Sequence, residues 1–509
     1  MKKRRILKII ELVFCTLFII VFFFSYYVNY NFGDISFEQV LFNIIYSEGA
    51  DYTILYKGVS YCLFLLILFY LLVYIKHFLY LFFKVKVYVK IGFKNNIKSI
   101  DLFKKTYFKT FIFLLLFGGI SLYKSYDYLN LKEYIDSQKT ASTLFEDYYV
   151  DGRDVKIEFP EKKRNLIHVY LESMESSYVS KENGGVFDKS LIPNLEKIAL
   201  ENINFSNTDK IGGALRLYNT DWTMAALVAT TAGIPLKVLD GNNYKGYGQS
   251  FPGVYNLGDI LKDNGYDNYF MIGSDADFGG RKDYFQYHGD YKIIDFNYAK
   301  ETKMIPNDYL VWWGYEDLKL FEFAKKKLIE ISKNDEPFNF TMLTVDTHFT
   351  DGYMDSTCKD VFDAKYKNSI YCSDSKVYKF IEWVKKQDFY ENTTIVLVGD
   401  HLTMQNNFVN DKSYQRTVYN TFVNSVTNTN NTKNRLFSSF DLFPTTLASL
   451  GIKIENNKLG LGVDLFSKEK TLIEIYNDID LLNFDLSKKS FYFDNMILGE
   501  TYYQMNDLK

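Results

Sequence analysis

Cysteine is scarce in this sequence, with four in 509 residues, and histidine is nearly as scarce, with five. Cys15 and Cys62 fall within long apolar runs, whereas Cys358 and Cys372 lie in a polar part of the chain. No further cysteine or nearby histidine completes a metal-binding set with Cys358 and Cys372, which excludes a zinc module there. The two are close enough in sequence to close a loop, and we expect a disulfide between them in an oxidising compartment.

Internal repeats and low-complexity tracts are absent, and acidic residues are scarce near the start of the chain. Residues 1–109 carry 15 Lys and Arg against six Asp and Glu, whereas residues 110–509 carry 44 against 56. The basic end also contains the long apolar runs. This division of charge and hydropathy is typical of a membrane portion followed by a large exported domain.

Three apolar runs have the length or composition of membrane spans, at residues 6–27, 59–83 and 108–123. A small-residue cleavage signature is missing after the first run, so we interpret that run as an uncleaved anchor and not as a signal peptide. Buried helices of a soluble protein are the alternative, but three such runs with alternating loop charge are hard to obtain otherwise. We predict a multi-pass protein of the bacterial cytoplasmic (inner) membrane.

Loop charge predicts the orientation of these spans. The connection at residues 84–109 carries eight Lys and one Asp and belongs inside with the N-terminus, whereas residues 28–57 carry four acids and one Lys and belong outside. Residues 124–509 are then periplasmic or extracellular. The expected parts are a membrane domain with three helices at 1–123, a juxtamembrane connector at 124–160, a catalytic domain at 161–466 and a C-terminal tail of unknown role at 467–509.

Four apolar segments of the exported region are predicted as buried strands with polar residues at their ends. They are residues 165–171, 269–275, 338–345 and 393–398, which end at Glu172, Asp275, Asp346 with His348, and Asp400 with His401. Helices are expected at 129–149, 193–201, 254–264, 310–333, 373–387 and 440–450. The alternation predicts an α/β domain with a mostly parallel sheet, whose site lies at the carboxyl ends of the strands.

An Ala-rich helix is predicted to carry the nucleophile. Asn219, Thr220 and Asp221 form an expected cap cluster before it, and Gly233 with Pro235 supplies the usual stop signals. Thr223 then lies in the first turn, where free N–H groups and the helix dipole stabilise a phosphoryl group or an alkoxide. Thr220 competes with Thr223 as the hydroxyl at the helix start.

Glu172, Asp400, His401 and the Thr223 hydroxyl together offer three or four oxygen and nitrogen ligands for one divalent cation. A mainly oxygen site with one imidazole suits Mn²⁺ or Mg²⁺, with Zn²⁺ less favoured. Of these ions we expect Mn²⁺. Such a cation lowers the pKa of the hydroxyl and turns it into a nucleophile. Arg281 and His348 are suited to bind the non-bridging oxygens of a phosphate.

Six segments of the exported region follow one another with distinctive spacing: Leu171-Glu-Ser-Met-Glu-Ser-Ser-Tyr178, Asp221-Trp-Thr-Met-Ala-Ala226 through Gly233-Ile-Pro235, Gly273-Ser-Asp275, Phe278-Gly-Gly-Arg281 with His288-Gly289, Leu343-Thr-Val-Asp-Thr-His348, and Gly399-Asp-His-Leu402. As a set they resemble the sulfatase-fold phosphoglycerol transferases of the alkaline phosphatase superfamily. This family includes the osmoregulated periplasmic glucan phosphoglycerol transferase and lipoteichoic acid synthase. The resemblance covers about residues 140–466, and several membrane spans before the domain also fit it.

The resemblance implies a role for each matching residue. Glu172, Asp400 and His401 match the family's metal ligands, Thr223 its threonine nucleophile, and Arg281 with His348 the residues that hold the phosphoglycerol group. The gap from Thr223 to Gly233 resembles the family's and favours Thr223 over Thr220. The implied reaction moves glycerol phosphate from phosphatidylglycerol to an envelope glycan or glycerol-phosphate polymer through a covalent threonine intermediate. No nucleic-acid partner is expected.

Rival functions share the fold. A sulfatase needs a Cys/Ser-x-Pro-x-Arg motif, which none of the four cysteines begins. A phosphoethanolamine transferase also uses a threonine and a membrane anchor, but its family usually has more exported cysteines and zinc-binding histidines. A non-catalytic envelope scaffold built on a degenerate sulfatase fold is the third alternative. Such degeneration should remove metal ligands, whereas the sequence keeps all four, which are Glu172, Thr223, Asp400 and His401. His168 is expected in the core, and Glu175 at the surface or in a cap.

Overall fold

The computed structural model describes residues 2–33, 35–45, 53–82, 88–93, 96–101, 107–237, 251–405 and 408–499. The chain divides into two compact units, which are described separately. The first contains Met1–Phe37 and Asp51–Glu133, and the second contains Glu38–Ala50 and Tyr134–Lys509.

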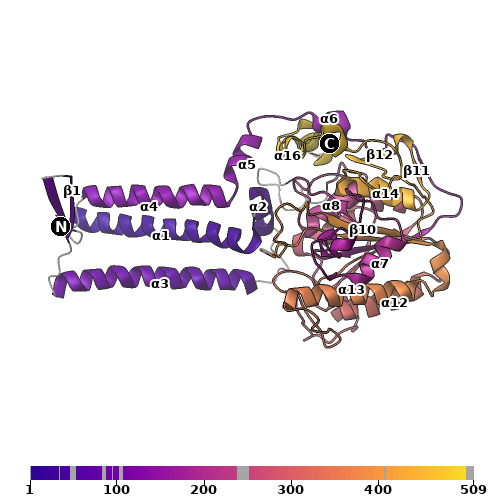
Figure 1. Cartoon of the computed structure of the whole chain (residues 1–509), viewed down its shortest axis with the longest axis horizontal. Helices are drawn as coiled ribbons and strands as arrows, with labels where there is room; N and C mark the ends of the chain where they lie inside the picture. Colours follow the sequence, from indigo (N-terminus) through magenta and orange to yellow (C-terminus); the bar gives the residue numbers. More distant parts are fainter. Residues whose placement is uncertain are drawn as a thin grey trace, which may run out of the picture. The chain divides into compact units, whose positions relative to one another are not determined.

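The first unit is built on three long helices that run alongside one another, α1 (Lys2–Phe32), α3 (Thr53–Phe82) and α4 (Tyr107–Tyr128), with a hairpin of β1 (Tyr88–Phe93) and β2 (Asn96–Asp101) (Figure 1). Small hydroxyl side chains join α1 to α4. Ser25 Oγ donates to Ser125 Oγ at 2.8 Å, and Ser121 Oγ donates to the Phe18 carbonyl at 2.8 Å. Close approach through small residues is the usual packing of helices in a membrane.

Two helical stretches of the first unit, Ile9–Phe32 and Tyr56–Ile75, are long and apolar enough to cross a membrane by length and composition. They cover most of the first two predicted spans. The third predicted run, residues 108–123, lies within α4. A third crossing and the orientation of all three stay predictions.

A seven-stranded sheet forms the centre of the second unit. Its order is β5 (Gly213–Ala214), β10 (Val418–Val423), β9 (Thr393–Gly399), β4 (Asn165–Leu171), β8 (Phe338–Leu343), β6 (Asp267–Ile272) and β7 (Lys292–Ile294). The five strands from β9 to β7 are parallel, and β10 runs antiparallel to both β9 and β5. The predicted α/β fold with a mostly parallel sheet is confirmed.

Strand β4 lies in the middle of the sheet, which explains why its sequence is apolar except for Asn165 and His168. Ile167, Val169 and Leu171 face a core that includes α7 (Pro193–Glu201), α12 (Asp317–Ile331) and α13 (Lys365–Val384). Leu166 and Tyr170 face the other side, which is covered by α8 (Thr223–Ala232) and α14 (Leu442–Ser449). Figure 1 shows α12 beside α13, and α8 and α14 on the opposite side. Because both faces are covered, neither face of β4 carries polar side chains for solvent.

The remaining elements of the second unit are short and surround this core. They are α2 (Phe37–Ile45), α5 (Leu131–Ser137, which begins in the first unit), α6 (Leu144–Tyr148), β3 (Ile157–Glu158), α9 (Leu257–Asp263), α10 (Arg281–Tyr287), α11 (Phe296–Glu301), β11 (Lys453–Ile454), β12 (Lys458–Leu459), β13 (Gly462–Val463), α15 (Leu472–Tyr476) and α16 (Ile479–Ser487).

Several predicted elements differ from those observed. The helix predicted at 310–333 begins only at Asp317, and the helix predicted at 373–387 begins earlier, at Lys365. The first turns of α13 bury polar side chains, including Asn368 and Ser369, so apolar periodicity does not reveal them. Strand β10 was not predicted. Within the C-terminal tail, residues 491–497 are helical.

Candidate active site

The helix α8 begins at Thr223, and the side-chain cap predicted for it is wrong. The N-cap residue is Trp222, which makes no side-chain cap hydrogen bond. The Thr220 hydroxyl bonds instead to the Leu217 carbonyl at 2.9 Å, which closes the preceding turn. The Thr223 hydroxyl is therefore at the first helical position and is not used as a cap. The helix ends as predicted at Gly233, which adopts a left-handed φ of 66°.

The other two residues of the expected cap cluster also have different partners. Asp221 forms an ion pair with Arg216 at 2.9 Å. Asn219 adopts a positive φ of 52°, and its side chain donates to the Leu236 carbonyl at 3.0 Å. Asn219, Thr220 and Asp221 therefore stabilise the loop that precedes α8 and do not cap the helix.

Glu172, Asp400 and His401 come together at the carboxyl ends of the neighbouring strands β4 and β9. Each offers one ligand atom, and these atoms lie within 4.8 Å of one another. The Nε2 atom of His401 is 3.5 Å from Glu172 Oε1, 3.4 Å from Asp400 Oδ2 and 3.4 Å from Thr223 Oγ1. The structure thus brings Thr223 and the three expected ligands to one point.

A sharp turn after β4 places these carboxylates. Ser173 has a positive φ of 53°, and its amide donates to Asp400 Oδ1 at 2.7 Å while its hydroxyl donates to Glu172 Oε1 at 2.8 Å. On the neighbouring strand, a Cβ at Gly399 would lie 1.9 Å from the Met174 carbonyl oxygen. Glycine is therefore required there for the two strand ends to approach each other.

The charge distribution of the cluster suits a divalent cation. Asp400 Oδ2 is buried and accepts no hydrogen bond from the described part of the chain. Burial and the neighbouring Glu172 carboxylate raise the pKa of Asp400 to about 7. Because His401 Nδ1 bonds to the Leu402 carbonyl at 2.9 Å, Nε2 is the ring nitrogen that faces the carboxylates of Glu172 and Asp400. Two carboxylates and one imidazole in this arrangement are better placed to coordinate a metal ion than to hydrogen-bond to one another.

Arg281 begins α10, after the left-handed residues Gly279 and Gly280. Its Nη2 donates to the Asp275 carbonyl at 2.9 Å, and its guanidinium carbon lies 5.2 Å from the centre of the Phe278 ring. The side chain is buried, which lowers its pKa to about 10 against the opposing effect of Glu172 and three aspartates. Arg281 stays charged at neutral pH, and its buried Nε has no hydrogen-bond partner among the described residues.

His348 lies in the loop that follows β8. Its Nδ1 bonds to the Phe349 carbonyl at 2.6 Å, so the proton is on Nδ1 and Nε2 is left as an acceptor. Its ring stacks at a tilt on Trp313, with the ring centres 4.7 Å apart. Burial lowers the pKa of His348 to about 4, and Asp400 and Arg281 are near enough to affect it. His348 is neutral at pH 7.

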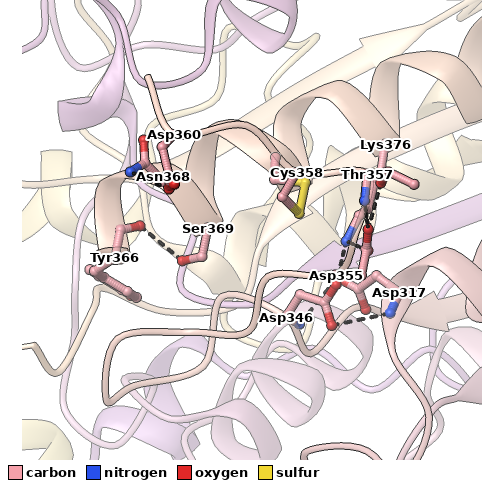
Figure 2. Close-up of a disulfide and its surroundings, with 11 residues drawn as sticks. Asp317, Asp346, Asp355, Thr357, Cys358, Asp360, Tyr366, Asn368, Ser369 and Lys376 are labelled. Carbon is pink, nitrogen blue, oxygen red and sulfur yellow. Dashed lines mark hydrogen bonds and ion pairs between the residues drawn. A yellow bond between two sulfur atoms is a disulfide. The ribbon is translucent and has the colours of Figure 1, made fainter. Parts of the chain in front are cut away.

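A buried charge network holds the loop before His348. Asp317 accepts hydrogen bonds from the amides of Val345 and Asp346, at 2.8 and 3.1 Å. Lys376 on α13 pairs with Asp346 at 2.6 Å and with Asp355 at 2.5 Å (Figure 2). Asp346, predicted at a strand end, thus has a structural role in the site.

Cys358 and Cys372 are joined by a disulfide, with an S–S distance of 2.09 Å. Figure 2 shows this bond beside the Lys376 network. It ties the loop after β8 to α13, one turn before Lys376. The His348 loop is therefore fixed to α13 both by ion pairs and covalently.

Sequence reasoning missed a contribution from α2, whose residues precede α8 by about 180 positions. Glu38 accepts a hydrogen bond from the Asn219 side chain at 2.6 Å and another from the Tyr218 hydroxyl. Phe42 lies with its ring centre 5.8 Å from that of Trp222. The only sequence signal for this contact is the amphipathic pattern of α2, because nothing local indicates which surface it covers.

Glu175 was expected at the surface or in a cap, and the second alternative is correct in position, because Glu175 is the N-cap residue of the short 3-10 helix Ser176–Tyr178, without a side-chain cap hydrogen bond. Glu175 is fully buried, accepts from the Thr403 amide at 2.8 Å and pairs with Arg416. It therefore fixes the loop that follows His401. Its burial depends on Arg416, which is distant in sequence, so the local pattern could not reveal it.

The family model described as Sulfatase matches residues 164–452. Phosphoglycerol transferase I of Escherichia coli O6:K15:H31 (strain 536 / UPEC) is 36% identical over 257 residues, which are 48% of this chain and 32% of that protein. Phosphoglycerol transferase I of Escherichia fergusonii is 37% identical over 257 residues, with the same coverage. The chain thus spans about a third of the length of the curated relatives it matches.

Among solved structures, the lipoteichoic acid synthase LtaP from Listeria monocytogenes is similar to this chain. The match has a TM-score of 0.48 and 17% identity, and covers 62% of this chain and 82% of LtaP.

Proposed function

Because the chain belongs to the sulfatase family, we propose that it is a membrane-anchored phosphoglycerol transferase. It moves glycerol phosphate from phosphatidylglycerol to an envelope glycan or polymer. The observation that carries the proposal is the position of Thr223 Oγ1, 3.4 Å from His401 Nε2 in the cluster with Glu172 and Asp400. The activity is extended from the relatives that bear this name over about a third of their length.

Glu172, Asp400, His401 and Thr223 would hold one divalent cation, for which we propose Mn²⁺ ahead of Mg²⁺ and Zn²⁺. Oδ2 of Asp400 accepts no hydrogen bond from the described residues, and Nε2 of His401 faces both carboxylates, which supports this ligand set. When bound, the ion supplies positive charge that lowers the pKa of a hydroxyl and offsets negative charge on a phosphate.

Thr223 is the proposed nucleophile. Its oxygen forms a bond to the phosphorus of the donor, the bond from phosphorus to the diacylglycerol oxygen breaks, and the released diacylglycerol takes up a proton. The acceptor hydroxyl then attacks the phosphothreonine, and its proton ends on the restored Thr223 hydroxyl. The free N–H groups of the first turn of α8 stabilise the phosphoryl oxygens in both steps.

Arg281 and His348 are the proposed ligands of the phosphoglycerol group. Arg281 is charged and has a buried N–H without a partner among the described residues, so it can donate to a non-bridging oxygen. Neutral His348 offers Nε2 as an acceptor for a glycerol hydroxyl. The Trp313 ring stacked on His348 limits the rotation of the imidazole.

Membrane attachment supports a lipid donor. Three spans with the N-terminus inside would place the domain outside the cytoplasm, where nucleoside triphosphates are not available. Phosphatidylglycerol headgroups at the bilayer surface would then be the nearest source of glycerol phosphate.

The test uses the purified full chain in vesicles that contain phosphatidylglycerol labelled in the headgroup glycerol. Release of diacylglycerol is expected only with a divalent cation, and Thr223→Ala should abolish it. Thr220→Ala is the matched control, because its hydroxyl serves the Leu217 turn, and activity should persist. Turnover of phosphatidylethanolamine without turnover of phosphatidylglycerol would replace the proposal with phosphoethanolamine transfer.

A further inference from the structure

The two histidines of the candidate site follow strands that are not neighbours in the sheet. His348 follows β8 and His401 follows β9, and β4 lies between these two strands. Strand β4 pairs with both of them, so the spacing of the loops after β8 and β9 is not fixed by strand pairing alone. A site that binds a phosphate from one loop and a metal ion from the other needs this spacing to be constant.

The hydroxyl of Tyr366 on α13 bridges these two loops. It donates to the Thr347 carbonyl at 3.0 Å, and Thr347 immediately precedes His348. Its oxygen also lies 2.6 Å from Oγ1 of Thr403, which follows His401 by two residues. Since the single proton of the tyrosine is used for Thr347, Thr403 is the donor in the second bond. One side chain is therefore bonded to both loops.

The residues that Tyr366 contacts are bonded in turn to the end of β4. The Thr347 hydroxyl donates to the Glu172 carbonyl at 2.6 Å. The Thr403 amide donates to Glu175 at 2.8 Å, and Glu175 belongs to the same segment after β4 as Glu172. These bonds form a ring of contacts that joins the ends of β4, β8 and β9 through Tyr366.

Burial makes the Tyr366 hydroxyl a rigid link. The residue is 2% exposed, and burial raises its pKa, so the hydroxyl stays protonated and can donate at neutral pH. Movement of either loop away from Tyr366 would leave a buried polar atom without its partner, which costs free energy. The two loops are therefore held at one separation.

One face of α13 holds the whole loop after β8 through four side chains, which are Tyr366, Ser369, Cys372 and Lys376. Figure 2 shows Tyr366, Ser369 and Lys376 along this helix, and spacings of three or four residues place side chains on one helix face. Ser369 packs against Gly352, where a Cβ would lie 2.3 Å from Ser369 Oγ. The disulfide to Cys358 and the ion pair with Asp346 are the other two contacts. Of the four side chains, Tyr366 also bonds to the loop after β9.

From this ring of contacts we propose that Tyr366 is a positioning residue of the transfer, which sets the distance between His348 and His401. The inference rests on the proposed function and adds a residue that acts through Thr347 and Thr403, without contact with the reacting atoms. A shift of about 1 Å between the two histidines would displace the bound phosphorus from Thr223, and a displacement of this size can lower a rate about a hundredfold.

The experiment compares Tyr366→Phe, which removes one oxygen and keeps the ring, with Tyr419→Phe. The control loses a matched bond, because the buried Tyr419 hydroxyl donates to the carbonyl of Leu195 on α7 at 2.8 Å. Diacylglycerol release by the full chain is measured in vesicles of phosphatidylglycerol. The Kd for Mn²⁺ alone is measured in phosphatidylcholine vesicles from the electron paramagnetic resonance signal of the free ion. Urea unfolding shows that each variant is folded.

In Tyr366→Phe, kcat should fall about tenfold or more and the Kd for Mn²⁺ should rise about tenfold, because contacts that orient metal ligands have effects of this size. Tyr419→Phe should lower the urea midpoint similarly but keep the wild-type kcat and Kd. Thr403→Val removes the same bond from the other side, and its loss of kcat should be less than additive with that of Tyr366→Phe.

Wild-type kcat and Kd in folded Tyr366→Phe, or equal losses in Tyr419→Phe, overturn the inference. If Tyr366→Phe does not fold, Thr403→Val decides by the same two measurements. Absence of diacylglycerol release from the wild type defeats the proposed function itself. That outcome is distinguishable, because the Kd for Mn²⁺ reports on the bridge without any lipid donor.

Discussion

Replacement of Asp400 by asparagine should stabilise the metal-free protein while removing its response to a divalent cation. Oδ1 of Asp400 accepts from the Ser173 and His401 amides at 2.7 and 2.8 Å, and an asparagine oxygen can keep both bonds. The amide nitrogen would take the place of Oδ2, which has no hydrogen-bond partner in the described part of the chain. The substitution therefore removes a charge and leaves the geometry.

The magnitude follows from the pKa of Asp400, which burial and Glu172 raise from 3.8 to about 7. A raised pKa means that the folded state binds the proton more tightly, so stability is present below pH 4 and is lost as pH rises toward 7. At 1.36 kcal/mol for each pH unit, the ionised carboxylate costs about 4 kcal/mol at pH 7 without metal. Asp400→Asn should recover most of this amount.

Tryptophan fluorescence in urea provides the assay, because all four tryptophans lie in the second unit. With chelator at pH 7, the variant should unfold at higher urea than the wild type. Addition of Mn²⁺ should stabilise the wild type only. Asp441→Asn is the control, because Asp441 is also buried with its pKa raised to about 7, but it bonds to Val463 and Ser438 away from the cluster. A metal-free Asp400→Asn protein that is less stable than the wild type and still responds to Mn²⁺ would show that the buried charge has no cost and that Asp400 is not a metal ligand.

Three further substitutions test the contact of α2 with the loop before α8, the ion pairs of Lys376 and the burial of His168. Glu38→Ala removes the hydrogen-bond acceptor for Tyr218 and Asn219 in the loop before α8. The kcat for diacylglycerol release should then fall about tenfold, which corresponds to about 1.4 kcal/mol in the activation free energy. An unchanged kcat would contradict a positioning role for Glu38. Lys376→Met leaves Asp346 and Asp355 buried without their cation. The free energy of unfolding, measured in urea, should fall by about 3–5 kcal/mol. A loss below about 1 kcal/mol would contradict a stabilising role for this ion-pair network. Burial lowers the pKa of His168 to about 3, so the unfolded state binds the proton more tightly and stability falls as pH drops below 6.5, by about 2 kcal/mol at pH 5. His168→Leu should remove that part of the acid sensitivity, and identical pH profiles for variant and wild type would count against it.

The sequence was most informative where one local pattern determined the structure. Strand β4 was predicted at the observed residues because an apolar run that is buried on both faces is unambiguous. Parallel strands place their carboxyl ends at one edge, so Glu172, Asp400 and His401 could be expected together before any distance was known. The start of α8 was predicted correctly, although for the wrong reason, since the expected caps serve the preceding loop.

Features that depend on distant parts of the chain could not be predicted in the same way. The contact of α2 with Asn219 joins residues about 180 positions apart, and no periodicity specifies such a pairing. A cleft lined by Phe187, Asp351, Tyr366 and Asp411 is assembled from four separate stretches of the chain, so its character arises only when the fold brings them together. The early start of α13 could not be predicted, because its first turns bury polar side chains and polar side chains are normally exposed.

The central claim is that Thr223 carries the transferred group. The most direct measurement is peptide mass spectrometry of the full chain after brief incubation with phosphatidylglycerol and Mn²⁺ without acceptor, followed by an acid quench. We expect a glycerol phosphate adduct on the peptide that contains Thr223, and this adduct should disappear when acceptor is added. An adduct on another residue, or acceptor labelling without any adduct on Thr223, would contradict it.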